Sequence, residues 1–275
     1  MKTLQELTLL DKFLFDEAME DSETYEALLR IILGDEELNL LTQSQTEKEF
    51  RTAPWLRSIR VDVFAMDENS TIYNTEMQKE KRDDLIKRSR YYQALIDSSL
   101  LAPGEVDFNN IKNTTIIMIT PFDLFGLGKY IYPFEYACTA FPELKLDDGA
   151  KRIFINTHGK NDEDVSREFL ALMKFIEYNE NEDINIESSP NLDKIKARVS
   201  LVKASEEVGV KFMQRWEEEA IIRHDAEEKG KEIGIDITRI ESIRNLMNNL
   251  KLTAEKAMEA LGIPKTEYEK YKAML

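Results

Sequence analysis

The chain has 275 residues, 42% of them hydrophobic and 9% aromatic, and its 53 acidic against 37 basic side chains give a net charge of −16. This composition supports a folded core and excludes a globally disordered or low-complexity chain. The acidic excess excludes a general nucleic-acid coat, which requires a basic surface. No apolar run approaches the ~20 residues that span a bilayer. The single cysteine, Cys138, favours a reducing compartment, as in a cytoplasmic protein.

The first part of the chain alternates between helical and extended patterns. Residues 3–34 have apolar side chains at helical spacing and predict two short helices ending at Gly34. Residues 38–46 alternate weakly and predict a strand. The clearest extended pattern is RSIRVDVFAM at 57–66, which is followed by the turn sequence DENS and a second extended run, TIYNTEMQ. Residues 57–78 therefore predict a β-hairpin.

The middle of the chain contains further helical and extended segments. Residues 81–100 have helical periodicity, and TTIIMIT at 114–120 is nearly all apolar, as in a strand buried on both faces. The remaining expected elements are extended segments at 130–139 and 152–157 and helices at 163–180 and 190–218. Strands flanked by helices predict an α/β fold with a central sheet.

The composition changes after Trp216. Residues 217–236 are highly charged with little apolar periodicity, which predicts a charged helical linker. Residues 237–275 predict two or three short helices, with Thr253 as an N-cap. The succession of short helices in this tail resembles a helix-turn-helix. Its last helix is only weakly basic, so DNA contact and protein contact both remain open.

Two carboxylates are expected on one patch of the predicted hairpin. Opposed residues of an antiparallel hairpin share parity, so Asp62 lies opposite Asn74 or Glu76, depending on the register. Gln78 shares the face of Glu76 because side chains alternate along a strand. Neighbouring carboxylates repel unless a cation or proton separates them, and oxygen ligands suit Mg²⁺ or Mn²⁺ better than zinc. The alternative is a solvent-facing pair that bridges to Arg60 or to a lysine.

A basic stretch directly follows the hairpin. Its cations are Lys79, Lys81, Arg82, Lys87, Arg88 and Arg90. A DNA backbone that passes the second strand would meet these charges, and a solvated helix face is the alternative. Arg88 and Tyr92 are four residues apart on the predicted helix, so their side chains can meet.

The hairpin IRVDVFAMDENSTIYNTEMQ and the following KRSRYYQALID resemble the PD-(D/E)XK nuclease superfamily, and more narrowly its Rpn-type recombination-promoting nuclease/transposase family. The resemblance runs from LTLLDKFLF through FDLFGLGKYIYPF and LDDGAKRIFINTHG to about Trp216. It implies a restriction-endonuclease-like mixed central sheet flanked by helices within residues 1–216, ahead of the small C-terminal helical segment. It also implies a metal-dependent endodeoxyribonuclease linked to DNA recombination or transposition.

The resemblance also implies roles for individual residues. Asp62 matches the aspartate of the first motif strand, Glu76 the acid of the second, and Gln78 the position of the superfamily's lysine. The two acids would hold Mg²⁺, or Mn²⁺ in its place. Asp11, in the LLDKFLF segment, is the candidate for a third metal ligand, with a helix N-cap as its alternative. Gln78 can donate a hydrogen bond but carries no charge. Glutamine is usual at this position in the Rpn-type family, so the resemblance implies that Gln78 is a catalytic variant and not the mark of a dead site.

The same resemblance places the KRSRYYQ segment beside the active site. We expect Arg88 to contact phosphate, Tyr91 and Gln93 to be further DNA contacts, and Tyr92 to lie mainly in the core. Arg60 shares the face of Asp62. We expect it to be a fourth DNA contact, which could supply the charge that Gln78 lacks, with a surface ion pair as its alternative.

Two functions remain open from the sequence. The first is the metal-dependent nuclease. The second is a catalytically weak or inactive nuclease-fold module that binds DNA or protein in mobile-element regulation or phage defence, which Gln78 and the net charge of −16 favour. Cutting both DNA strands requires two sites, which would favour a homodimer, although no residue pattern indicates one.

Overall fold

The computed structural model describes residues 2–51, 58–178 and 188–275. The chain divides into two compact units, Met1–Gly209 and Val210–Leu275. The boundaries expected at residues 216 and 236 stay predictions. Within the described ranges, no helix combines the length and the apolarity that a membrane crossing requires.

The first unit is built around a mixed sheet. Its strands are β1 (Gln45–Phe50), β2 (Ile59–Met66), β3 (Ile72–Met77), β4 (Thr114–Thr120), β5 (Ile131–Phe134) and β6 (Ala150–Asn156). Their order in the sheet is β1-β2-β3-β4-β6-β5. The central strands β3, β4 and β6 are parallel, whereas β1 with β2, β2 with β3, and β5 with β6 pair antiparallel. The hairpin predicted at 57–78 is confirmed over its described residues as β2 and β3.

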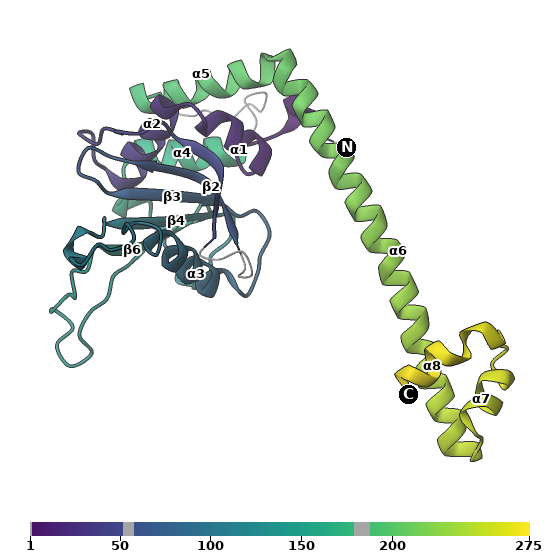
Figure 1. Ribbon diagram of the computed structural model, residues 1–275. Helices are drawn as coiled ribbons and strands as arrows, with labels where there is room; N and C mark the ends of the chain where they lie inside the picture. Colours follow the sequence, from purple (N-terminus) through teal and green to yellow (C-terminus); the bar gives the residue numbers. More distant parts are fainter. Residues whose placement is uncertain (1, 52–57, 179–187) are drawn as a thin grey trace. The chain divides into compact units, whose positions relative to one another are not determined.

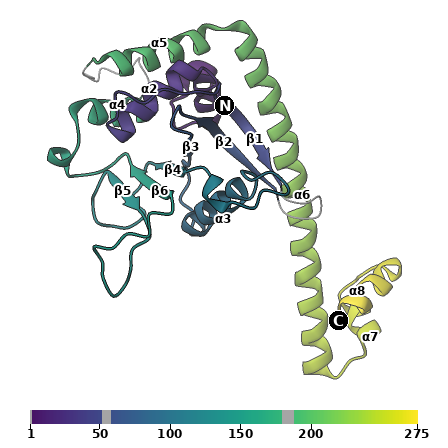
Figure 2. The ribbon, with the colours of Figure 1, turned by 60° about the vertical axis from the view of Figure 1, so that its left-hand side comes forward.

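Helices cover both faces of this sheet (Figure 1). On one face lie α1 (Lys12–Met19), α2 (Ser22–Leu33), α4 (Arg167–Glu177) and α5 (Pro190–Ala204), and on the other lies α3 (Leu85–Asp97). The view in Figure 2 shows the same separation. The predicted α/β fold with a mixed central sheet flanked by helices is therefore confirmed.

The core explains why β4 is nearly all apolar. All seven of its residues are buried because helices lie over both faces of the sheet. On the α3 side, Ile116 and Met118 pack in one cluster with Leu85 and Ile96. The parallel central strands are thus held between two layers of helices, and β3, which carries Glu76, pairs with β4 along its whole length.

Two predicted elements differ most from the structure, and the extended segment expected at 130–139 is a strand only over Ile131–Phe134. The strand expected at 38–46 is wrong for most of its length, since β1 begins only at Gln45. The preceding loop is held by α2 side chains, because Arg30 donates to the Leu38 carbonyl and Glu26 accepts from the Leu40 amide. These contacts satisfy backbone groups that a strand would have used.

The single helix expected at 190–218 is also wrong. It is interrupted at Ser205, which has an extended backbone between α5 and α6 (Glu206–Leu250). The Ser205 hydroxyl accepts from the Val208 amide at 3.3 Å, so it caps the start of α6.

The second unit consists of most of α6 together with α7 (Ala254–Ala260) and α8 (Tyr268–Met274). These helices enclose a small core of Ile240, Ile243, Ala257, Met258, Ile263 and Tyr271. Thr253 caps α7 as predicted, through its side chain and the Lys256 amide. Residues 217–236 lie inside α6, so the expected helical linker is helical. The predicted C-terminal helical segment is confirmed.

Truncation of this small core should unfold the second unit selectively. Ile243 is fully buried, so Ile243→Ala should cost roughly 2–5 kcal/mol of stability. Ile237→Ala is the matched control, because Ile237 lies on the same helix and is 51% exposed. We expect hydrogen exchange to accelerate in α7 and α8 in the first variant only, with β2–β4 unchanged. Equal exchange in both variants would contradict this view of the core.

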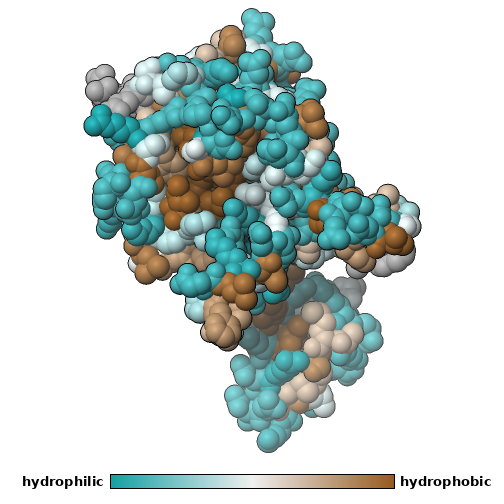
Figure 3. Space-filling view, turned by 90° about the vertical axis from the view of Figure 1, so that its left-hand side faces the viewer, coloured by the Kyte–Doolittle hydropathy of each residue, from teal (hydrophilic) through white to brown (hydrophobic). Residues whose placement is uncertain are grey.

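The surface is mainly hydrophilic on the face shown in Figure 3, in agreement with the net charge of −16. Apolar side chains gather in one hollow of this face. Large apolar side chains are also exposed between β5 and β6, where Tyr136, Phe141 and Leu144 are 50%, 69% and 61% exposed. These side chains lie outside the acidic site of the β2–β3 hairpin.

Candidate active site

The register of the hairpin brings the two predicted acids together. Val63 pairs with Thr75 and Phe64 with Asn74, which places Asp62 opposite Glu76. Of the two registers that parity allows, the structure therefore has the one in which the carboxylates are directly opposed.

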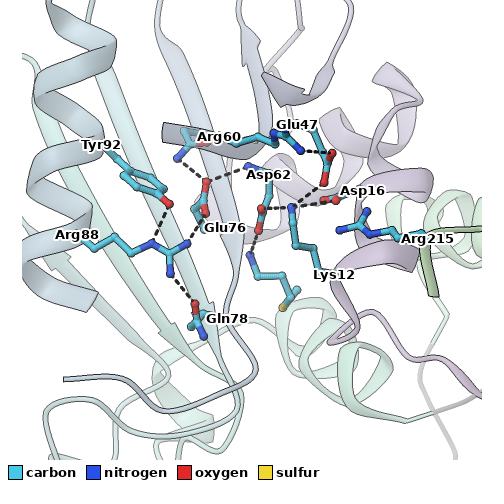
Figure 4. Close-up of polar contacts among 12 residues, drawn as sticks. Lys12, Asp16, Glu47, Arg60, Asp62, Glu76, Gln78, Arg88, Tyr92 and Arg215 are labelled. Atoms are coloured by element: carbon cyan, nitrogen blue, oxygen red, sulfur yellow. Dashed lines mark hydrogen bonds and ion pairs between the residues drawn. The ribbon is translucent and has the colours of Figure 1, made fainter. Parts of the chain in front are cut away.

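At this end of the hairpin, backbone-to-side-chain hydrogen bonds take the place of the backbone–backbone hydrogen bonds between the strands. The Asp62 amide donates to Glu76 Oε1 at 2.9 Å, and the Met77 amide donates to Asp62 Oδ2 at 3.0 Å. Each carboxylate thus holds the backbone of the opposite strand, and the two acids lie side by side (Figure 4).

Both acids are buried, and their proximity is electrostatically unfavourable. Asp62 is 4% and Glu76 2% exposed. Burial, and next the charge of Asp62, raise the pKa of Glu76 from 4.5 to about 8. The Asn74 amide group donates to Glu76 at 3.3 Å, while its buried Oδ1 has no hydrogen-bond partner within the described ranges. The carboxylates of Asp62 and Glu76 and the Asn74 Oδ1 atom can therefore accept more cations or hydrogen-bond donors than the chain itself provides.

Arg88 of α3 is the cation on the Glu76 side. Its guanidinium lies 3.7 Å from Glu76 Oε2, donates to Gln78 Oε1 at 3.0 Å, and donates to the Tyr92 hydroxyl at 2.8 Å. The predicted contact between Arg88 and Tyr92 is confirmed, and Tyr92 is buried as expected. The Gln78 amide group donates to the Glu80 carbonyl at 2.8 Å, so both ends of this carboxamide are engaged.

Lys12 of α1 is the cation on the Asp62 side, and the sequence analysis did not identify it. Its Nζ pairs with Asp62 Oδ1, lies 2.9 Å from Asp16 Oδ2, and lies 3.7 Å from Glu47 Oε1. Asp16 is also buried, and its burial raises its pKa to about 7 even though Lys12 opposes the shift. The available clue was the helical i,i+4 spacing of Lys12 and Asp16 in the segment that resembles the nuclease family.

Glu47 reaches this cluster through an unusual backbone conformation. It lies on β1 between the pairs that Thr46 and Lys48 make with β2, and its φ is 52°. A left-handed conformation costs a residue other than glycine on the order of 1–3 kcal/mol. Arg60 pairs with Glu47 at 3.3 Å and stays 63% exposed in its side chain, which agrees with its alternative as a surface ion pair.

Asp11 lies apart from this cluster in its described contacts. It occupies the N-cap position of α1, accepts from the Thr8 amide at 3.0 Å, and pairs with Lys79 at 2.6 Å and Lys2 at 3.7 Å. Its position is that of the N-cap alternative, although its side chain accepts from no amide of the first turn of α1. The acid of α1 that shares a cation with Asp62 is instead Asp16.

The donor chemistry of the acidic pair fits a hard divalent cation, although the set is small. In residues 2–51, 58–178 and 188–275, no three acidic, histidine or cysteine side chains are arranged to hold a metal ion. Asp62 and Glu76 provide two carboxylates, Asn74 adds a buried amide oxygen, and water commonly completes such shells. Because Lys12 and Arg88 already pair with the two acids, a metal ion would compete with both.

An open, cationic pocket of about 580 Å³ adjoins Arg88. Its charged and aromatic lining includes Arg60, Arg82, Asp84, Lys87, Arg88, Tyr91 and Tyr92. Three of the four expected DNA contacts, Arg60, Arg88 and Tyr91, therefore line one surface. Gln93 does not, because it is buried and donates to the Thr114 carbonyl at 3.3 Å. This placement argues against a DNA contact by Gln93.

A family model described as PD-(D/E)XK nuclease family transposase matches residues 12–229 of the chain. The chain belongs to this family. The match contains the Asp62–Glu76 pair, Gln78 and Lys12, and it begins one residue after Asp11. A search of the curated proteins found no match. Membership of the PD-(D/E)XK nuclease family transposases supports a nuclease-type function with DNA as the substrate.

Proposed function

We propose that this PD-(D/E)XK family member is a metal-dependent endodeoxyribonuclease that hydrolyses DNA phosphodiester bonds in the cytoplasm, during recombination or transposition. The observation that carries the proposal is the pair of reciprocal hydrogen bonds by which Asp62 and Glu76 each hold the opposite strand. These bonds keep two carboxylates adjacent at one end of the β2–β3 hairpin, near the cationic pocket that adjoins Arg88.

Asp62 and Glu76 would hold Mg²⁺, or Mn²⁺ in its place. When bound, such an ion lowers the pKa of water and offsets the repulsion between the phosphate and the two acids. In the hydrolysis, a water molecule gives up a proton to solvent and its oxygen bonds to phosphorus, one P–O ester bond breaks, and the leaving oxygen receives a proton from solvent. Arg88 binds the phosphate from the Glu76 side, and Gln78 and Tyr92 fix its guanidinium.

The direct test of this function is nicking of a supercoiled plasmid by the wild-type chain. We expect nicked circles with Mg²⁺ or Mn²⁺ and none in excess EDTA. Linear products would require cuts in both strands, made by two chains acting together or by successive nicks. Cleavage that persists in EDTA, or no cleavage with either metal, would contradict the proposal.

A second function is favoured by Gln78. This residue is neutral, and both polar ends of its side chain bond within the protein, so it cannot take the role of the superfamily's lysine. A nuclease-fold module without catalysis would bind DNA, show no nicking with any metal, and retain its binding after Glu76→Ala. The plasmid assay therefore separates the two functions.

The cationic pocket gives a prediction that holds for both functions. Arg88→Met should weaken DNA binding by roughly tenfold and reduce the salt dependence, because one phosphate contact is lost. Binding is measured by fluorescence anisotropy in EDTA at several salt concentrations. Arg167→Met is the control, since Arg167 is exposed at the start of α4, on the opposite face of the sheet. Equal losses in both variants would indicate a non-specific charge effect.

A further inference from the structure

We propose that Lys12 is the active-site lysine of this chain, and that it supplies beside Asp62 the positive charge that Gln78 lacks. The inference rests on the proposed nuclease function and extends it to a residue of α1. Its basis is the arrangement of cations around the acidic pair.

The two residues that follow β3, Gln78 and Lys79, do not place a positive charge beside Asp62 and Glu76. Gln78 is uncharged, and its carboxamide is held between Arg88 and the Glu80 carbonyl. Lys79 is cationic, but its Nζ pairs with Asp11 at 2.6 Å. A positive charge close to Asp62 therefore has to come from another element.

Lys12 has the required position. Its ammonium donates to Asp62 Oδ1 and to Asp16 Oδ2, and these bonds anchor it at the acidic pair (Figure 4). The Lys12 side chain is 37% exposed, whereas that of Asp62 is 6% exposed. A ligand that approaches Asp62 from solvent therefore meets the ammonium group of Lys12.

Lys12 also keeps its charge at this site. A lysine ammonium is charged at neutral pH, and here the carboxylates of Asp62 and Asp16 both accept from it. It can therefore stabilise the negative charge that develops on a phosphate.

Arg88 does not duplicate this role. It lies on the Glu76 side of the pair, where Tyr92 and Gln78 fix its planar guanidinium. Lys12 is a compact charge on a flexible stem, and it lies on the Asp62 side. The two cations thus flank the acidic pair from α1 and α3, one for each carboxylate.

The test compares Lys12→Gln, which retains hydrogen bonding without charge, with Lys12→Arg, which retains charge. We expect Lys12→Gln to lower Mn²⁺-dependent plasmid nicking by roughly 100-fold. Lys12→Arg should retain most of the activity, and Gln78→Lys added to Lys12→Gln should restore at least roughly tenfold by returning a charge to the pair. Lys129→Met is the control, because Lys129 forms a similar ion pair with Asp164 outside the site.

A second readout separates a catalytic lysine from a merely structural one. Mn²⁺ binding, measured by calorimetry, should be equal or tighter in Lys12→Gln, because the ammonium competes with the metal for Asp62. Unchanged nicking in Lys12→Gln, or loss of Mn²⁺ binding and thermal stability together with nicking, would overturn the inference while the nuclease function stands. A wild-type chain that nicks with neither metal would remove the nuclease function and this inference together.

Discussion

Asp62→Asn is expected to lower Mg²⁺-dependent plasmid nicking by roughly 1,000-fold. Stabilisation of transition-state charge by a metal ion is worth several kcal/mol, and about 1.4 kcal/mol corresponds to a factor of ten in rate. The substitution preserves the shape of the side chain and an oxygen that can accept from the Met77 amide, so the hairpin should stay intact. The measurement is the initial rate of conversion of supercoiled to nicked plasmid.

Asp67→Asn is the matched control for this variant. Asp67 is as buried as Asp62, at 4% exposure, but it lies at the turn end of the same hairpin, where it accepts from the Thr71 amide and the Tyr73 hydroxyl. Its substitution should change nicking only a few-fold, through stability. If Asp62→Asn cleaves as fast as the wild type, Asp62 has no part in the reaction.

Glu76→Gln is expected to separate activity from stability. Removal of one of the two acids should lower nicking by roughly 100-fold, because the metal loses a ligand. The same change should raise the melting temperature of the metal-free protein at pH 8 by on the order of 5 °C. The gain arises because a buried charge next to Asp62 is replaced by a neutral group of the same shape.

The sign of this stability change depends on pH. The pKa of Glu76 is higher in the folded state, about 8, than its ordinary 4.5, so between these values the folded state binds more protons than the unfolded state. The stability of the wild type therefore falls as pH rises through this window. The pKa of Asp16 is also raised, and this shift contributes to the pH dependence of stability in both the wild type and Glu76→Gln. Melting curves from pH 5 to 8 should show a shallower decline for Glu76→Gln, and parallel declines would refute this assignment.

The hairpin and the buried strand β4 were predictable because local patterns determine them. Alternation in RSIRVDVFAM, the DENS turn and the nearly all-apolar TTIIMIT each specify an extended segment without reference to the rest of the chain. Parity restricted Asp62 to two possible partners. The choice of Glu76 follows from the turn geometry and from the pairing of β3 with β4, which residue types alone do not encode.

Of the two cations that flank the acidic pair, Arg88 was predictable from the sequence and Lys12 was not. Arg88 follows the second motif strand closely and forms a helical pair with Tyr92, so local spacing revealed it. Lys12 meets Asp62 across 50 positions of sequence, through the packing of α1 against β1 and β2. Asp11 was the more conspicuous acid in the same segment, but it occupies the N-cap position of α1 and pairs with Lys79. The packing of α1 against the sheet, which a single sequence does not reveal, determines that Lys12 and not Asp11 contacts Asp62.

Mn²⁺ titration of the purified chain tests most directly whether the opposed side chains of β2 and β3 act together as a metal site. Calorimetry should detect binding by the wild type, binding weakened by at least roughly tenfold in Asp62→Asn and in Glu76→Gln, and no binding in the double variant. Asp67→Asn should bind as the wild type does. A double variant that still takes up Mn²⁺ with wild-type affinity would contradict the account.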